Sequence, residues 1–183
     1  CLAPLGTALT AEQVRLLKRF ADSGLLAFDA DEAGRRAAER AILLCEQAGL
    51  NIEVVRFQEG KDAAEILEKG GPQALHKSLK CPINSFQFFI ETARARHDPR
   101  TPEGKKAIIG SLRPYLAAVD SQVKRDGYFR LLAEQLGVEF DSVRADFLRG
   151  APRPVPARRE EARAAEQGLT ADYFFMLAVA VHR

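Results

Sequence analysis

The hydrophobic and polar positions of the first 80 residues alternate between a helical period and short continuous apolar runs. Residues 10–21 carry apolar side chains at helical spacing behind a Thr-x-x-Gln capping box. The apolar run 25–28 predicts a strand that is covered on both faces, and residues 52–57 form the next predicted strand. Between them, residues 33–48 place small and apolar side chains on one face of a helix. Strand, helix and strand with short links predict parallel strands and a right-handed crossover.

The pattern changes after residue 80. Residues 83–149 follow the helical period almost throughout, which predicts several packed helices. Residues 150–168 combine prolines with many charges, as linkers do. The apolar stretch 173–181 predicts the beginning of a further element. The expected organisation is an α/β domain with a parallel sheet and flanking helices, then an all-α helical subdomain, a linker and the start of a further domain: 1–80, 81–149, 150–168 and 169–183.

Composition and charge narrow the classes of protein. With 46% hydrophobic residues, a chain of 183 residues can build a core, so global disorder is excluded. The formal net charge of +2 excludes a globally basic nucleic-acid coat but leaves room for a local basic groove. The three cysteines have no metal-ligand spacing and cannot all pair with one another, which favours a reducing compartment and a cytoplasmic location. No apolar run approaches about 18 residues, so we expect no membrane span.

The sharpest chemical feature is an acidic pair, Asp29 and Asp31, directly after the first predicted strand. Ligands of open α/β sheets bind beyond the carboxyl ends of the strands, and side chains two positions apart on an extended segment point the same way. The two carboxylates can therefore converge on one cation such as Mg²⁺. Asp62 follows the second strand and leaves the same edge of the sheet. The alternative is that Asp31 and Asp62 cap the helices that begin just after them.

Two basic residues, Arg35 and Arg36, stand at the start of the helix that follows the acidic pair. A guanidinium matches the geometry of a phosphate, so these residues are candidates for holding a nucleotide or nucleic-acid phosphate. A solvated helix face is the alternative. Glu32 lies in the first turn of the same helix, where a negative charge is favourable.

Three segments resemble the TOPRIM segment of bacterial DNA primases of the DnaG type, in the same order and at the same spacing: 3–10, 28–35 and 59–62. The resemblance covers residues 1 to about 150. It implies an enzyme that synthesises short RNA primers on a single-stranded DNA template from nucleoside triphosphates, by metal-dependent nucleotidyl transfer. It also implies a C-terminal domain that docks on the replicative helicase. Residues 169–183 would be the start of that domain, with its first helix at about 171–182.

The resemblance assigns roles to the acidic residues. Asp29 and Asp31 would be catalytic and, with Asp62, would bind Mg²⁺, or Mn²⁺ in its place. The family's Asp-Pro-Asp motif reads Asp62-Ala63-Ala64 here, so only its first acid is present. A further Glu of the family, its zinc-binding domain and its template-binding part would lie upstream of Cys1. We therefore expect the chain to be a piece of a longer protein and to be inactive by itself.

Two rival functions remain open at this stage. One is another TOPRIM enzyme, a topoisomerase or a nuclease; a topoisomerase needs a nucleophilic tyrosine, and Tyr115, Tyr128 and Tyr173 all lie in predicted helical stretches. The other is a non-catalytic module that contacts the helicase, in which the acidic site has degenerated at Ala64.

Overall fold

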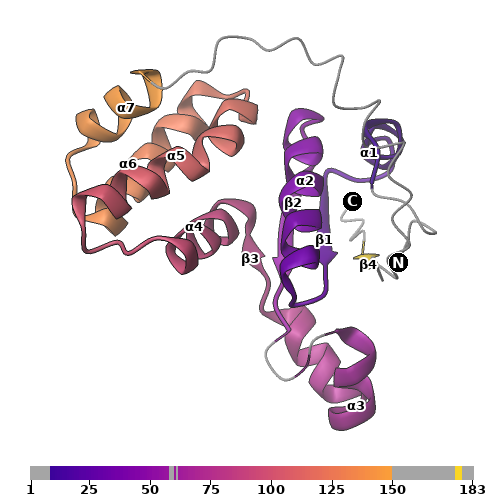
Figure 1. Ribbon diagram of the computed structural model, residues 1–183. Coiled ribbons are helices and arrows are strands. Elements are labelled where there is room, and N and C mark those ends of the chain that lie inside the picture. Colours follow the sequence, from indigo (N-terminus) through magenta and orange to yellow (C-terminus); the bar gives the residue numbers. More distant parts are fainter. Residues whose placement is uncertain (1–8, 58–59, 61, 150–175, 179–183) are drawn as a thin grey trace, which may run out of the picture.

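The computed structural model describes residues 9–57, 60, 62–149 and 176–178, and it shows an α/β unit followed by a bundle of helices (Figure 1). In chain order its elements are α1 (Ala11–Lys18), β1 (Ser23–Ala27), α2 (Glu32–Gln47), β2 (Asn51–Val55), α3 (Ala63–Lys80), β3 (Ile83–Asn84), α4 (Ser85–Arg96), α5 (Pro102–Ala118), α6 (Gln122–Leu136), α7 (Phe140–Arg149) and β4 (Met176–Ala178). The expected fold class is confirmed. Among the described residues, no helix combines the length and the apolar character needed to cross a membrane.

The centre of the sheet has the predicted topology. The strand order is β3-β2-β1-β4, and β1 and β2 run parallel with Leu26 opposite Val54. Helix α2 is the crossover between them, and it ends at Gln47, two residues before Gly49, whose φ of 69° suits the left-handed residue that closes a helix. The two outer strands run antiparallel to their neighbours, so the sheet is mixed rather than wholly parallel.

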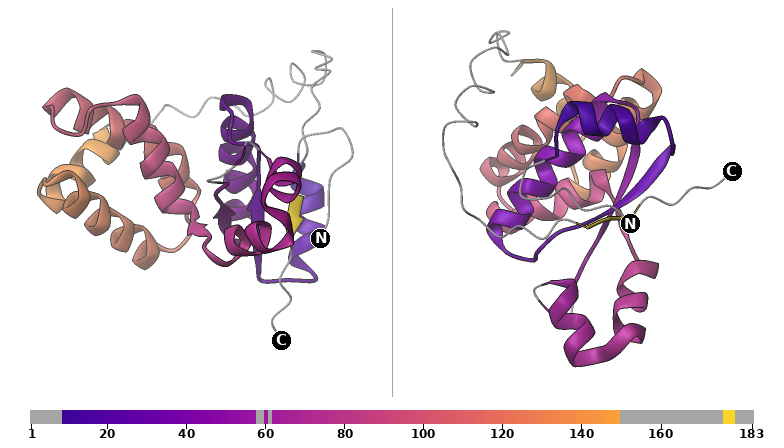
Figure 2. Two further views of the ribbon diagram at one scale, coloured as in Figure 1. Left: turned by 90° about the horizontal axis from the view of Figure 1, so that it is seen from below. Right: turned by 90° about the vertical axis from the view of Figure 1, so that its right-hand side faces the viewer.

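Helix α3 explains why β3 runs antiparallel to β2. The expected helix from Ala63 does form, but Gly71 interrupts it with a φ of 66° and a ψ of −175°, and Pro72 follows. The chain therefore turns back in a helical hairpin whose two arms project away from the sheet (Figure 2). Because it leaves and returns at the same end of the sheet, the next strand must run in the opposite direction.

The helix expected over 171–182 is wrong for the residues that the structure describes there. Met176–Ala178 form strand β4, which pairs antiparallel with β1 so that Leu177 lies opposite Leu26. A short apolar run fits a buried helix and a buried strand equally well, and here the open edge of β1 supplies hydrogen-bond partners that the local sequence does not reveal. The other residues of that expected helix, and the linker 150–168, lie outside the described residues.

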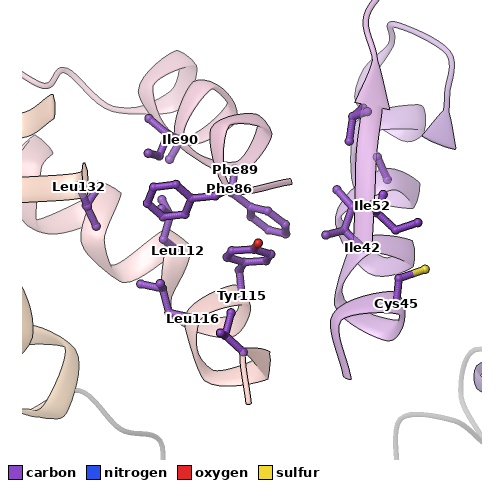
Figure 3. Packing of buried hydrophobic residues seen from close by; sticks show 14 of the residues in the cluster. Ile42, Cys45, Ile52, Phe86, Phe89, Ile90, Leu112, Tyr115, Leu116 and Leu132 are labelled. Carbon is purple, nitrogen blue, oxygen red and sulfur yellow. The ribbon is translucent and has the colours of Figure 1, made fainter. Parts of the chain in front are cut away.

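The sheet and the helical bundle share one hydrophobic core. Figure 3 shows Ile42 of α2 facing the aromatic side chains of α4 and α5. Phe89 stacks on Tyr115 with ring centroids 4.9 Å apart. The buried hydroxyl of Ser85 donates a hydrogen bond to the carbonyl oxygen of Ile52, at 2.6 Å, and so ties the start of α4 to β2. This packing fixes α4 relative to the sheet and therefore fixes which α4 side chains reach the sheet edge.

Candidate functional site

A cleft of about 460 Å³ opens where the two parallel strands end, between them and helices α2 and α4. It contains three acidic and three basic side chains together with apolar and small residues. Its lining is Phe28, Asp29, Ala30, Glu32, Arg35, Ala38, Val54, Val55, Arg56, Phe57, Phe88, Glu91, Thr92, Ala95 and Arg96. The cleft lies at the edge of the sheet where the sequence predicted a ligand site.

Asp29 is held in this cleft by a close approach of the backbone. The strand β1 and the buried Phe28 lead directly to it, and Asp29 itself is partly buried. A Cβ atom placed on Gly34 would lie 2.2 Å from the carbonyl oxygen of Asp29. The first turn of α2 therefore packs on the main chain of Asp29, and only glycine permits this contact.

The other two acidic candidates act as helix caps. The Oδ1 of Asp31 accepts a hydrogen bond from the backbone N–H of Gly34, at 2.6 Å, and that of Asp62 accepts one from Glu65, at 2.7 Å. Neither residue lines the cleft. Within the described part of the chain, no group of three His, Cys, Asp or Glu side chains is arranged to hold a metal ion. The structure thus brings only Asp29 of the three into the cleft, and their catalytic and metal-binding roles stay predictions.

The two predicted phosphate-binding arginines are placed differently. Arg35 lines the cleft, where it donates hydrogen bonds to Glu32, at 2.9 and 3.2 Å, and to the carbonyl oxygen of Ala30, at 2.9 Å. Arg36 pairs with Glu32 at 3.4 Å and does not line the cleft. The hydrogen bond from Arg35, with the nearby charge of Arg96, keeps the pKa of Glu32 below its ordinary value. Glu32 is therefore a carboxylate at neutral pH, as its place in the first turn of α2 favours.

Three functional candidates escaped the sequence reasoning: Arg56, Glu91 and Arg96. Arg56 follows β2 directly and donates a hydrogen bond to Glu91 of α4, at 3.0 Å. Arg96, in the last turn of α4, pairs with Glu32 at 3.1 Å and Glu39 at 3.3 Å, both on α2. The place of Arg56 at a strand end was a usable signal. Nothing local pointed to Glu91 or Arg96, because their partners lie 35 and 64 residues away in the sequence.

A tyrosine nucleophile is absent from the described part of the cleft. Tyr115 is 1% exposed, and its burial and its contact with Tyr128 raise its pKa above the ordinary value. The two hydroxyls lie 3.3 Å apart, and Tyr128 also stacks on Phe86 with centroids 4.3 Å apart. Both rings therefore serve the core, and Tyr173 lies outside the described residues.

Two family models match successive parts of the chain. A family model described as Toprim-like matches residues 1–67, which include β1, α2 and β2 together with Asp29, Asp31 and Asp62. A second model, described as the DnaB-helicase binding domain of primase, matches residues 86–141. The chain is thus a Toprim-like α/β unit followed by helices. Over most of its length it is similar to a segment of bacterial DNA primases of the DnaG type, as the sequence motifs indicated.

The most similar curated proteins include the DNA primase of Treponema pallidum, 36% identical over 148 residues, which are 81% of this chain and 24% of that protein. The DNA primase of Aquifex aeolicus is 34% identical over 124 residues, 68% of this chain and 23% of that protein. The chain spans about a quarter of the length of these relatives.

Solved primase structures share the fold. The Aquifex aeolicus primase, solved with its zinc-binding and RNA polymerase domains, superposes with a TM-score of 0.61 at 29% identity, over 76% of this chain and 33% of that one. A DNA primase domain from Pseudomonas aeruginosa gives a TM-score of 0.65 at 26% identity, over 79% of this chain and 46% of that one. The RNA polymerase domain of a Mycobacterium tuberculosis primase, in complex with double-stranded DNA, gives 0.58 at 31% identity, over 74% and 44%.

The helicase-binding match falls on a different segment from the one we expected. It covers 86–141, within the predicted helical subdomain 81–149, whereas the sequence suggested that such a domain would begin at 169. The domain boundaries proposed from the sequence stay predictions.

Proposed function

We propose that this chain is part of a DNA primase that joins nucleoside triphosphates into short RNA primers on a single-stranded DNA template. The observation that carries the proposal is the cleft at the ends of two parallel strands, in which Asp29 and three guanidinium groups line one space. Carboxylates suit a divalent cation and guanidiniums suit phosphates, which are the two parts of a metal-bound triphosphate. The similarity to DNA primases supports nucleotidyl transfer as the reaction that this combination of side chains serves.

The described residues do not fit a metal centre built from three protein carboxylates. They fit an ion that keeps several waters and shares the oxygens of the substrate, which is the usual habit of Mg²⁺. In this proposal Asp29 is the direct ligand of the ion, and Asp31 and Asp62, whose Oδ1 atoms cap α2 and α3 outside the cleft lining, contact the ion through its bound waters. When bound, Mg²⁺ or Mn²⁺ would neutralise negative charge on the phosphates and on the leaving pyrophosphate.

The chain's own residues position the substrate. Asp29 stays at a fixed place because Gly34 packs against its main chain. In the proposal, Arg35 and Arg36 bind the phosphates from the start of α2, where the helix dipole also favours negative charge. Orienting the phosphates in a partly closed cleft aligns the reacting phosphorus with an attacking 3′ hydroxyl.

The proposed partners are the single-stranded template, the nucleoside triphosphates and the replicative helicase, and the proposed location is the cytoplasm. The match to a helicase-binding domain over 86–141 supports the helicase as a partner. A purely non-catalytic module is not favoured, because it would leave the charged cleft at the strand ends unexplained. A topoisomerase is not favoured, because Tyr115 is buried and bound to Tyr128.

Calorimetric titration with Mn²⁺ and a nucleoside triphosphate tests the proposal on the chain itself. We expect Asp29→Asn and Asp31→Asn to weaken binding of the pair by about tenfold or more, as the loss of a charged ligand does. Asp22→Asn is the control, because Asp22 pairs with Lys18 at 2.5 Å outside the cleft. Equal binding by all three variants would refute the site.

Activity gives a second test. In a complete primase that carries these residues, Asp29→Ala or Asp31→Ala should abolish primer synthesis, and the 183-residue chain by itself should make no primers. Full-rate synthesis by the Asp29→Ala enzyme would refute the catalytic assignment.

A further inference from the structure

Two arginines that belong to no recognised motif, Arg56 and Arg96, stand at the rim of the same cleft. We propose that both bind the phosphate chain of the triphosphate. In the absence of the triphosphate, Glu91 holds the guanidinium of Arg56 in place and Glu32 holds that of Arg96. This inference rests on the proposed function and deepens it, because it names the residues that recognise the polyphosphate.

The geometry surrounds one space with three guanidiniums from three different elements. Arg35 comes from the first turn of α2, Arg56 from the segment after β2 and Arg96 from the last turn of α4. All three line the cleft, and their side chains are 42%, 45% and 40% exposed in that order. Solvent, and therefore a dissolved anion, can reach each of them.

The existing carboxylate partners are easily exchanged. Glu91 is 39% exposed where it pairs with Arg56, and Glu32 is 48% exposed where it pairs with Arg96. The second partner of Arg96, Glu39, is less exposed, at 23%. Ion pairs with this much exposure contribute little to stability, because water screens them. A phosphate group offers a guanidinium two parallel charged hydrogen bonds and a larger negative charge. In the proposal, a bound phosphate therefore replaces these carboxylates as the partner of each guanidinium.

The alternative is that these pairs only hold the helices to the sheet, since each joins α4 to the α/β unit. The molecule contains a control for this at the opposite end of the sheet. Lys124 of α6 forms an ion pair with the nearly buried Glu46 of α2, and it lines a separate cleft. Lys124→Gln thus breaks a contact between the same two units and removes nothing from the site.

The test is calorimetric titration of the chain with inorganic triphosphate in a buffer that contains Mg²⁺. We expect Arg56→Gln and Arg96→Gln each to weaken binding about tenfold, the effect of one lost charged hydrogen-bonding partner. Lys124→Gln should bind as the unmodified chain does. Arg56→Lys and Arg96→Lys keep the charge and the carboxylate pair but lose the planar fork, so they should recover only part of the affinity. They also keep the test open if a Gln variant unfolds.

Each other outcome has a defined meaning. If Arg35→Gln weakens binding and the Arg56 and Arg96 variants do not, the inference is wrong and the proposed function stands. If Lys124→Gln weakens binding as much as they do, the two arginines serve only to hold the units together. If the unmodified chain does not bind triphosphate, the proposed function fails together with the inference.

Discussion

The contact between Gly34 and Asp29 gives the sharpest prediction about how this sequence builds its cleft. In Gly34→Ala the new methyl group would lie 2.2 Å from the carbonyl oxygen of Asp29 and 2.9 Å from its carbonyl carbon. Both atoms belong to the backbone, so no side chain can swing away. Ordinary contact begins near 3.4 Å, so the two segments must separate by about 1 Å in a region that is packed like a crystal.

The magnitude follows from two opposing effects. Replacing glycine by alanine inside an unobstructed helix stabilises it by up to about 1 kcal/mol. Forcing an extra methyl group into a filled space costs about 1–3 kcal/mol. Gly110, within α5, has no atom within 4 Å of the Cβ position, so Gly110→Ala is the matched control that shows the first effect without the second. The first effect is common to both variants, so we expect Gly34→Ala to be less stable than Gly110→Ala by about 1–3 kcal/mol.

Urea unfolding followed by circular dichroism measures this difference. When the same two variants are titrated with Mn²⁺ and a nucleoside triphosphate, Gly34→Ala should bind more weakly than Gly110→Ala, because only Gly34→Ala displaces Asp29. If both variants unfold at the same urea concentration, the close approach at Gly34 does not exist and our account of how Asp29 is placed is wrong.

Three further predictions test the caps, the core and the charge network. Asp62→Ala should lower the free energy of unfolding by about 1 kcal/mol, whereas Asp62→Asn, which still caps, should leave it nearly unchanged; equal losses in urea unfolding would argue against the cap. Burial raises the pKa of the Cys45 thiol to about 12, so iodoacetamide should label the exposed Cys81 in the native protein and Cys45 only after unfolding, as mass spectrometry of digested protein would report. The hydrogen bond from Arg35 lowers the pKa of Glu32 in the folded chain, so its stabilising contribution is complete above the ordinary value of 4.5 and is lost as the pH falls below it. When the pH falls through that range, the free energy of unfolding should therefore decrease less for Glu32→Gln than for the unmodified chain. Urea unfolding at several pH values measures this, and the same decrease in both proteins would contradict the network.

The parts of the fold that the sequence could predict are those set by local interactions. The crossover β1-α2-β2 follows from apolar runs and from a glycine at position 49 that closes a helix. The capping box at Thr10 is present, with the Gln13 side chain accepting from the Thr10 N–H at 2.9 Å. Each of these involves residues within a few positions of one another, so the pattern contains nearly all the information.

The parts that could not be predicted depend on contacts between distant segments. The strand at Met176–Ala178 exists because β1 has an open edge, and its own apolar residues fit a helix as well. The site shows the same limit. Asp29 and Arg35 could be placed from one strand end and one helix start, but Glu91 and Arg96 reach the cleft only because α4 packs against α2 and β2. The same reasoning foresaw that Asp31 and Asp62 could be caps, and the structure confirms the caps without testing their other roles.

The most direct test of the central claim is nuclear magnetic resonance of the chain with a small amount of Mn²⁺ and a nucleoside triphosphate. A bound paramagnetic ion broadens the signals of nearby backbone amides. The account predicts selective broadening around Asp29, Arg35 and Arg56, with the signals of α6 and α7 unchanged. Broadening that is absent from the cleft, or that centres on another part of the chain, would contradict it.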